Sequence, residues 1–271
     1  MVSTPIGNPG DITERALQIL GDVDVIACED TRRTGQLLAS HGIRKPLVSH
    51  YEHNEAQRVP DLIARLKEGA RIALVTDAGT PAISDPGFRL VRAALDAGIA
   101  VRAVPGPSAA IAALSIAGLP TDRFVFEGFL PTRDGALRKR LEALAREPRT
   151  MVFYEAGRRL PETLAAMSSA FGDNREAAVV REITKTYEET LRSSLRELTA
   201  RFEKTEALGE ITIVVAGASE DGTSADAGVT VEMLLEEGIS LKQASAIVAK
   251  LTGRSRRDVY QEALKKRPEP E

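Results

Sequence analysis

The chain has 271 residues, of which 43% are hydrophobic and 28% charged, a composition typical of a globular protein. No apolar run reaches the roughly 18 residues of a membrane-spanning helix, and the N-terminus lacks the charged and apolar regions of a signal peptide. Cys28 is the only cysteine, which excludes an internal disulfide and favours a reducing compartment. We therefore expect a cytoplasmic protein with no membrane anchor, in which Cys28 is buried rather than nucleophilic.

The net charge of −3 hides an uneven distribution along the chain. Residues 1–240 carry 28 basic and 35 acidic side chains, whereas residues 241–271 carry 8 basic and 4 acidic ones. A basic end on an acidic body predicts contact with a polyanion at that end. A solvated helical face would give the same pattern, so both interpretations stay open from the sequence.

Short apolar strands alternate with helical segments in the first half of the chain. The patterns predict strands at residues 23–28, 46–49, 72–76 and 101–104, and helices at 12–20, 34–41, 56–68, 87–97 and 108–117. Such alternation is typical of a parallel sheet covered by helices. We expect residues 1–120 to form an α/β lobe.

The pattern changes beyond residue 120. Strands are predicted at residues 124–131, 150–154, 177–180 and 209–217, with a charged helix at 133–146. We expect residues 121–218 to form a second α/β lobe with a mixed sheet. A small polar linker at 219–228 then leads to a C-terminal helical domain at 229–271, with short helices at 231–237, 241–251 and 256–265.

Three loops that contain Gly and Pro follow predicted strands, at residues 3–11, 76–87 and 105–108. Loops at the carboxyl ends of parallel strands share one edge of the sheet, where open α/β sheets bind ligands. The longest loop, TDAGTPAISDPG, matches neither the dinucleotide pattern G-x-G-x-x-G nor the phosphate-binding P-loop. We expect the three loops to line one cleft for another kind of ligand.

The order of the motifs resembles the ribosomal RNA small-subunit methyltransferase I family. The resemblance covers residues 2 to about 265 and is carried by STPIGN (3–8), DIT (11–13), CEDTRRT (28–34), HNE (53–55), TDAGTPAISDPG (76–87), PGPSAAIAAL (105–114), GLPTDRFVFEGFLP (118–131) and REITKTYEE (181–189). It implies a two-lobe α/β fold of the tetrapyrrole-methylase type, with a small helix-turn-helix-like C-terminal domain. Only Met1 and Val2 precede the first motif, so we expect a truncated start or a short first strand.

The resemblance also implies S-adenosylmethionine as the cofactor, held between the two lobes. Glycines in the loops would let the backbone approach it closely. The expected contacts come from the loops and from strand ends of the second lobe: Pro5, Gly79, Thr80, Pro81, Ile83, Ser84, Ser108, Tyr154, Gly209, Glu210 and Ile211. For Tyr154, a role as an aromatic core residue is equally open.

The implied reaction is 2′-O-methylation of a cytidine ribose in the decoding region of 16S rRNA. A ribose hydroxyl is a poor nucleophile while protonated, so a nearby base would help. Asp30, after the predicted strand at 23–28, is our candidate for the base or an orienting group, with a helix-capping role also open. Lys185 is the second candidate, for contact with the attacking oxygen, with an ordinary ion pair open as well.

Several basic residues are predicted to hold RNA phosphates, which gives salt-sensitive binding with little sequence information. They lie in the DTRR segment and in the C-terminal domain: Arg32, Arg33, Lys250, Arg254, Arg256 and Arg257. His50 and His53 are spaced three apart, but histidine and cysteine are too scarce elsewhere for a zinc site, so we expect no metal.

The implied partner is 16S rRNA within the 30S subunit, and the implied assembly is a homodimer. Two other functions stay open from the sequence. One is methylation of a small tetrapyrrole, against which the basic C-terminal end and the DTRR segment argue. The other is RNA binding without catalysis, which the intact loops disfavour.

Overall fold

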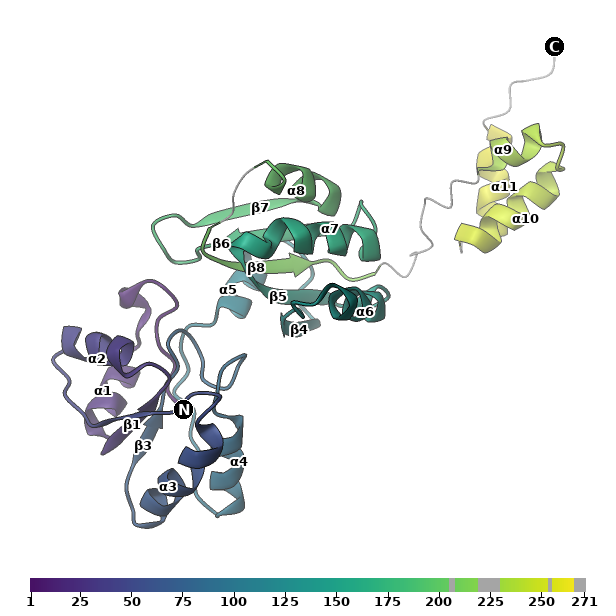
Figure 1. The fold of residues 1–271 in the computed structure, drawn as a ribbon. Helices are drawn as coiled ribbons and strands as arrows, with labels where there is room; N and C mark the ends of the chain where they lie inside the picture. Colours follow the sequence, from purple (N-terminus) through teal and green to yellow (C-terminus); the bar gives the residue numbers. More distant parts are fainter. Residues whose placement is uncertain (205–207, 219–229, 253–254, 266–271) are drawn as a thin grey trace.

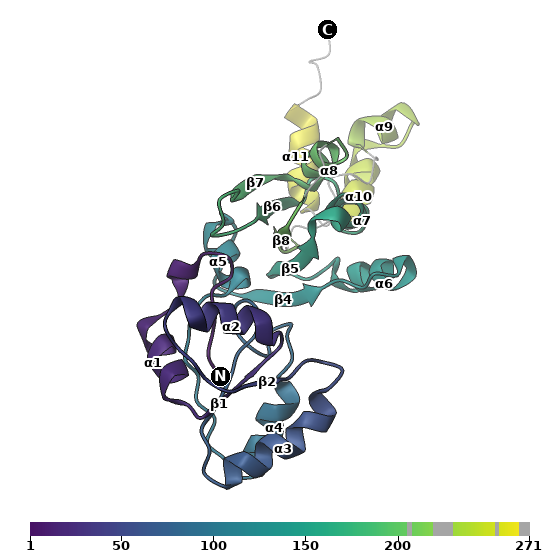
Figure 2. The same ribbon diagram turned by 60° about the vertical axis from the view of Figure 1, so that its left-hand side comes forward.

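The protein consists of two α/β lobes and a group of three C-terminal helices (Figures 1 and 2). The structure is a computed structural model that describes residues 1–204, 208–218, 230–252 and 255–265. The predicted linker at 219–228 lies outside the described residues. The expected domain boundaries stay predictions.

The first lobe is built on a parallel sheet with strand order β2-β1-β3. Its strands are β1 (Val25–Cys28), β2 (Leu47–Ser49) and β3 (Ile72–Leu74), and its helices are α1 (Glu14–Asp22), α2 (Thr31–Ser40), α3 (Glu55–Lys67) and α4 (Phe88–Asp96). All four residues of β1 are buried, as expected for a central strand covered on both faces. Cys28 is buried, as predicted.

Alternate side chains of β1 pack into two separate hydrophobic clusters in this lobe. Ile26 packs in one cluster with Leu20 of α1 and Leu38 of α2. Ala27 points the other way, into a cluster with Leu62 of α3 and Leu90 of α4. Helices thus cover both faces of the sheet, and the strand ends are left free to carry loops.

The predicted strand at 101–104 is wrong in extent, because only Val104 forms a bridge, with Val2. Val2 also donates its N–H to the Leu74 carbonyl at 2.9 Å, so the start of the chain lies beside β3. At the place of the expected short first strand, the structure has this single bridge and, among the described residues, no named strand before β1.

The second lobe has a mixed sheet with strand order β4-β5-β8-β6-β7. Its strands are β4 (Phe124–Phe129), β5 (Thr150–Ala156), β6 (Glu176–Arg181), β7 (Glu189–Ser194) and β8 (Glu210–Val215). Only β4 and β5 are parallel, and the other neighbours are antiparallel. Its helices include α6 (Asp134–Leu144), α7 (Leu160–Phe171) and α8 (Leu195–Phe202).

Helix α5 (Ala109–Ile116) packs on the second sheet, although its residues fall within the expected first lobe. Its Ala113 and Leu114 share a cluster with Val152 of β5 and Val214 of β8. The opposite face of the sheet is covered by α6, α7 and α8, which contact Met151 and other alternate residues. Figure 1 shows α5 between the two lobes.

The C-terminal helices are α9 (Val231–Glu236), α10 (Leu241–Thr252) and α11 (Arg256–Lys265). They share a small core that includes Val231, Val248 and Val259, one from each helix. This agrees with the predicted helical domain. None of the described helices is both long and apolar enough to cross a bilayer.

Candidate active site

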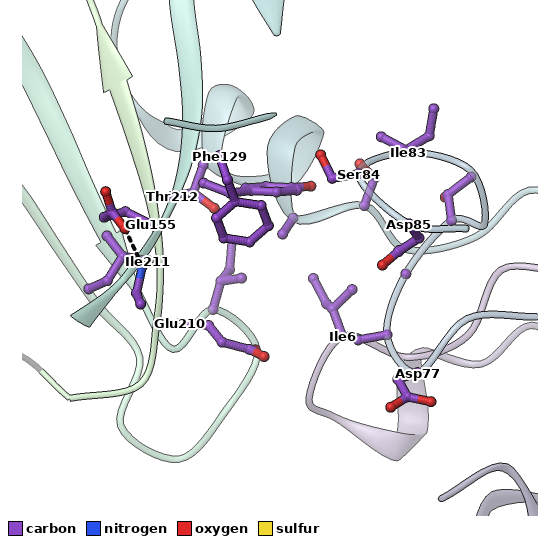
Figure 3. A pocket seen from close by; sticks show the side chains of 18 of the residues that line it. Ile6, Asp77, Ile83, Ser84, Asp85, Phe129, Glu155, Glu210, Ile211 and Thr212 are labelled. Carbon is purple, nitrogen blue, oxygen red and sulfur yellow. Dashed lines mark hydrogen bonds between the residues drawn. The ribbon is translucent and has the colours of Figure 1, made fainter. Parts of the chain in front are cut away.

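A cavity of about 450 Å³ lies between the two lobes. The first lobe lines it with residues of all three predicted loops, among them Ile6, Thr80 and Ser108. Figure 3 shows Ile6 and Asp77 facing Glu210 across it. The prediction that the three loops line one cleft is confirmed. We call this space the main cavity.

Direct hydrogen bonds tie the three loops together. Thr4 and Gly79 exchange backbone hydrogen bonds of 2.9 and 3.1 Å. The Thr80 hydroxyl lies 3.0 Å from the Ser3 hydroxyl and donates to the Pro107 carbonyl at 3.2 Å. Thr80 therefore links the other two loops from the centre of the site.

The loop at 76–87 contains unusual backbone conformations. Ala82 and Ser84 have φ values of 70° and 61°, in the left-handed region that non-glycine residues seldom adopt. Gly79 and Gly87 have φ values of 88° and 136°, which explains glycine at those positions. Such strain is typical of ligand-binding loops whose surroundings hold them in place.

Glu55 anchors the far end of this loop. Its carboxylate accepts a hydrogen bond of 3.1 Å from the backbone N–H of Gly87. His50 and Arg89 approach the same carboxylate at 3.6 and 3.7 Å. Burial lowers the pKa of His50 against the opposing effect of Glu55, and the described residues offer its ring nitrogens no hydrogen bond. Glu55 thus joins the start of α3 to the loop.

The second lobe gives the main cavity an aromatic wall. Tyr154 and Phe129 line it, with ring centroids 5.5 Å apart. The Tyr154 hydroxyl accepts a hydrogen bond of 3.1 Å from the Ala110 N–H, at the start of α5. Gly209, Glu210 and Ile211 complete this wall at the start of β8.

The lining of the main cavity is strongly acidic. Its carboxylates are Glu29, Asp77, Asp85, Glu155 and Glu210, against the one cationic side chain of Arg33 among the described lining residues. Burial raises the pKa of Asp85 to about 6, a Thr76 hydrogen bond opposes the rise, and the charges of Glu29 and Asp77 add to it. Burial also raises the pKa of Glu29. The cavity therefore favours a ligand that carries positive charge.

A second, smaller space of about 320 Å³ adjoins the main cavity, and we call it the side pocket. It has apolar residues from the first lobe and Lys185 and Glu210 from the second. The full set is Pro5, Ile6, Gly7, Pro9, Arg33, Thr34, Leu37, Thr76, Asp77, Ala78, Lys185 and Glu210.

Lys185 lies at the contact between the lobes. Its Nζ atom donates to Glu182 and Glu210 at 2.9 Å each, and its aliphatic stem packs against Gly7. Burial lowers the pKa of Lys185, but the two carboxylates outweigh this and raise it. Lys185 is therefore a fixed cation, and the ion pair left open by the sequence is present.

The predicted cofactor contacts gather at the main cavity with two exceptions. Nine of them line it: Gly79, Thr80, Ile83, Ser84, Ser108, Tyr154, Gly209, Glu210 and Ile211. Pro5 lines the side pocket instead, and the buried Pro81 is in neither lining. The contacts themselves stay predictions.

Asp30 caps α2 and lines neither space. Its carboxylate accepts the backbone N–H of Arg32 at 2.7 Å and of Arg33 at 3.4 Å. The Arg32 N–H in particular lowers the pKa of Asp30, so its carboxylate is a weak base. The capping role is the one that the geometry supports.

The predicted RNA contacts lie in two places. Arg33 lines both spaces, whereas Arg32 is 88% exposed and lines neither. Lys250, Arg256 and Arg257 are exposed on the C-terminal helices, and Arg254 lies outside the described residues. No group of three or more His, Cys, Asp or Glu suited to a metal occurs among the described residues.

The sequence did not single out several lining residues, including Glu29, Asp85 and Phe129. Glu29 and Asp85 belong to motifs that were recognised, and their place after a strand was the signal that could have found them. For Phe129 the signal was weaker, because an aromatic residue at the end of a strand is equally typical of the hydrophobic core.

Known protein families match both the two-lobe part and the C-terminal part of the chain. Residues 1–199 match the tetrapyrrole (corrin/porphyrin) methylases, and residues 221–267 match the RsmI C-terminal HTH domain. Among solved structures, uroporphyrin-III-C-methyltransferase from Thermus thermophilus is similar, with a TM-score of 0.57 and 24% identity over 79% of this chain and 92% of that one. The methyltransferase CobJ has a TM-score of 0.58 and 22% identity over 80% and 94%. These likenesses concern the fold.

Curated relatives are similar over nearly the whole chain. Ribosomal RNA small subunit methyltransferase I of Xylella fastidiosa is 48% identical, covering 96% of each chain. The protein of the same name from Escherichia coli O157:H7 is 46% identical, over 97% of this chain and 93% of its own. This chain therefore belongs to the ribosomal RNA small subunit methyltransferase I family, within the tetrapyrrole methylases.

Proposed function

We propose that this protein transfers a methyl group from S-adenosylmethionine to the ribose 2′-hydroxyl of a cytidine in 16S rRNA. The observation that carries the proposal is the acidic, aromatic-walled main cavity, built from loops of both lobes in a chain of this family. The substrate nucleotide comes from the family resemblance.

The main cavity fits S-adenosylmethionine in its chemistry. The cofactor carries a positive sulfonium, which suits the carboxylates of the lining, and an adenine, which suits Tyr154 and Phe129. A related structure, uroporphyrin-III C-methyltransferase from Thermus thermophilus, is a complex with S-adenosyl homocysteine. When bound, the cofactor supplies an activated methyl group.

The chain's own contribution is then to position the two reactants and exclude water. Loop residues Gly79 and Thr80 offer backbone groups at the cavity wall, and the links of Thr80 to Ser3 and Pro107 hold them still. Fixed geometry of this kind supplies on the order of 7–11 kcal/mol in favourable cases.

RNA is the substrate that the C-terminal helices favour over a tetrapyrrole. Lys250, Arg256 and Arg257 are exposed there, and a macrocycle needs no such basic surface. We further propose that the 30S subunit presents the RNA, that the protein is a cytoplasmic homodimer, and that Arg32 contacts a phosphate.

The deciding experiment offers radiolabelled S-adenosylmethionine with 30S subunits, naked 16S rRNA or a uroporphyrin-type macrocycle. We expect label in the ribose of a cytidine of 30S rRNA, located by nuclease digestion and chromatography. Label in the macrocycle alone would replace the proposed function with small-molecule methylation. RNA binding without any transfer would point to a non-catalytic module. Sedimentation of the purified protein tests the dimer.

A further inference from the structure

We infer that the side pocket receives the acceptor nucleotide, and that the carboxylate of Asp77 accepts the proton of its 2′-hydroxyl. The inference rests on the proposed function and assigns a place and a base to the acceptor. It begins from the position of the side pocket, which is lined by residues of both lobes.

The two spaces share part of their lining and are therefore adjacent. The residues common to both linings are Ile6, Arg33, Asp77, Ala78 and Glu210. Methyl transfer needs the attacking oxygen and the methyl carbon about 3–3.5 Å apart and in line. The proposal places the methyl donor in the main cavity and the acceptor in the side pocket, so that the methyl carbon and the attacking oxygen approach each other beside these shared residues.

The lining of the side pocket suits a nucleotide. Pro5, Pro9 and Leu37 offer an apolar surface for a base and the carbon face of a ribose. Arg33 and Lys185 bring two cations from the two lobes to the same pocket, each already paired with carboxylates, and a phosphate would bind as an additional partner of one of them. At about 320 Å³, the pocket lies at the small end of ligand sites, which fits one residue of RNA rather than a macrocycle.

RNA reaches such a pocket only if the nucleotide leaves its stack. Single-stranded RNA commonly binds proteins in this way, with the base turned outward against apolar or aromatic groups. The half-buried Leu37 of α2 would then contact the base. The exposed Arg32, earlier on the same helix, remains available to the neighbouring backbone.

Asp77 is the carboxylate best placed to act as the base. Of the acidic residues lining the main cavity, only Asp77 and Glu210 also line the side pocket, and Glu210 is paired with Lys185 and 76% exposed. The side chain of Asp77 is 22% exposed. Figure 3 shows it beside Ile6, on the opposite side of the site from Phe129.

Two donors hold the Asp77 carboxylate in a fixed orientation. The backbone N–H of Asp30 donates to Oδ1 at 3.0 Å, and Arg33 Nη1 donates to Oδ2 at 3.3 Å. A carboxylate has room for about four donors, so the acceptor hydroxyl can still donate to it. The role predicted for Asp30 thus passes to Asp77, which Asp30 holds through its backbone.

In the proposed step, the 2′-hydroxyl proton passes to the Asp77 carboxylate as the oxygen forms its bond to the methyl carbon. The carbon–sulfur bond breaks, and its electron pair stays on sulfur, which becomes a neutral thioether. The proton later leaves Asp77 for solvent.

The first test plugs the side pocket with Leu37→Trp and uses Gln36→Trp as the matched control. Leu37 lines only the side pocket, and its neighbour Gln36 is exposed and lines neither space. Calorimetry measures binding of S-adenosylmethionine, and ribose labelling of 30S subunits measures transfer. We expect Leu37→Trp to bind the cofactor normally and to lose transfer by about 10²-fold.

Three other outcomes would contradict the proposal. Full transfer by Leu37→Trp, or loss of cofactor binding with the fold intact by thermal unfolding, would overturn the assignment of the side pocket. If the unaltered protein labels no ribose, the proposed function fails instead, and the assignment fails with it.

The second test compares Asp77→Asn with Asp30→Asn and needs no change of packing. Asparagine at 77 can still accept the Asp30 N–H, and asparagine at 30 still caps a helix. We expect Asp77→Asn to lower the single-turnover rate, measured at saturating cofactor and RNA, by about 10²–10⁴. Equal rates in the two variants, or a larger loss in Asp30→Asn, would remove Asp77 as the base.

Discussion

The hydroxyl of Tyr154 accepts the backbone N–H of Ala110 at 3.1 Å, which fastens the aromatic wall of the main cavity to the first turn of α5. In the loop directly before α5, the carbonyl of Pro107 accepts a hydrogen bond from the Thr80 hydroxyl. A chain of contacts therefore runs from β5 of the second lobe to the 76–87 loop of the first.

Tyr154→Phe should weaken both the fold and the cofactor site. The substitution keeps the ring but leaves the part-buried Ala110 N–H without its acceptor, which costs about 1–3 kcal/mol. We expect a lower midpoint of thermal unfolding and a higher Kd for S-adenosylmethionine. Tyr187→Phe serves as the control, because that side chain is 76% exposed and lines neither space. Identical effects of the two substitutions would contradict the role given to the hydroxyl.

The pKa of Asp85, raised to about 6 chiefly by burial, predicts a pH dependence of cofactor binding. Asp85 is largely protonated below that pH and ionised above it, and Glu29, Asp77 and the Thr76 hydroxyl act on it directly. A positive sulfonium binds better to the ionised form, so affinity should rise between about pH 5 and 7. Calorimetry across this range checks the rise, which Asp85→Asn should flatten.

The raised pKa of Asp85 also predicts that the stability of the ligand-free protein falls as the pH rises, whereas its affinity for the cofactor increases. The folded state holds the Asp85 proton more tightly than the unfolded state, in which the carboxyl has its ordinary pKa of 3.8. Stability is therefore lost as the pH rises from about 4 through about 6. Asp85→Asn should unfold at a higher temperature than the unaltered chain at pH 7, and at a similar temperature near pH 3.5. A variant less stable at pH 7 would argue against the raised pKa.

Glu55 offers a test of how the 76–87 loop is held. Glu55→Ala removes the acceptor for the Gly87 N–H, and the strained backbone at Ala82 and Ser84 loses its anchor. We expect faster amide hydrogen exchange in residues 82–87 and weaker cofactor binding. Glu55→Gln retains an acceptor oxygen and should exchange more slowly than Glu55→Ala. Equal exchange in both variants would assign the effect to charge rather than to the hydrogen bond.

The C-terminal helices predict a separable contribution to RNA affinity. Replacing Arg256 and Arg257 with Gln should weaken RNA binding and reduce the slope of log K against log salt, by about 0.7–0.9 for each phosphate that the variant no longer neutralises. Calorimetry should show unchanged affinity for S-adenosylmethionine. A matched double change on the first lobe, Arg15→Gln with Lys67→Gln, controls for net charge, because both side chains are exposed there. An unaltered salt slope would exclude these arginines from the RNA interface.

The sequence predicted the buried strands of the first lobe well, because four or five consecutive apolar residues such as 25–28 have few alternatives. It missed β7, whose residues ETLRSS form an edge strand with little apolar alternation. It also missed α7 and α8, although their apolar residues cover one face of the second sheet. Edge strands and covering helices depend on tertiary contacts that a local pattern does not carry.

The same distinction between local pattern and tertiary contact explains which residues of the candidate site could be predicted. Nine predicted cofactor contacts line the main cavity because they lie in loops whose position after strands was readable. Asp30 follows β1, but its carboxylate caps α2, whereas Asp77 follows the neighbouring strand β3 and lines both spaces. Which of two carboxylates after neighbouring strands faces a pocket depends on local backbone direction, which spacing alone does not determine.

The packing of α5 on the second sheet has a mechanical consequence. With α5 belonging physically to the second lobe, the chain passes between the two sheets through residues 105–107, Pro-Gly-Pro. Each proline fixes its own φ angle, and the Thr80 hydroxyl donates a hydrogen bond to the carbonyl of Pro107. The connection is therefore a restrained segment rather than a free hinge, and it leads directly into Ser108 and Ala109, which line the main cavity. The two halves of the site are held at working distance before any ligand arrives, which lowers the entropic cost of binding.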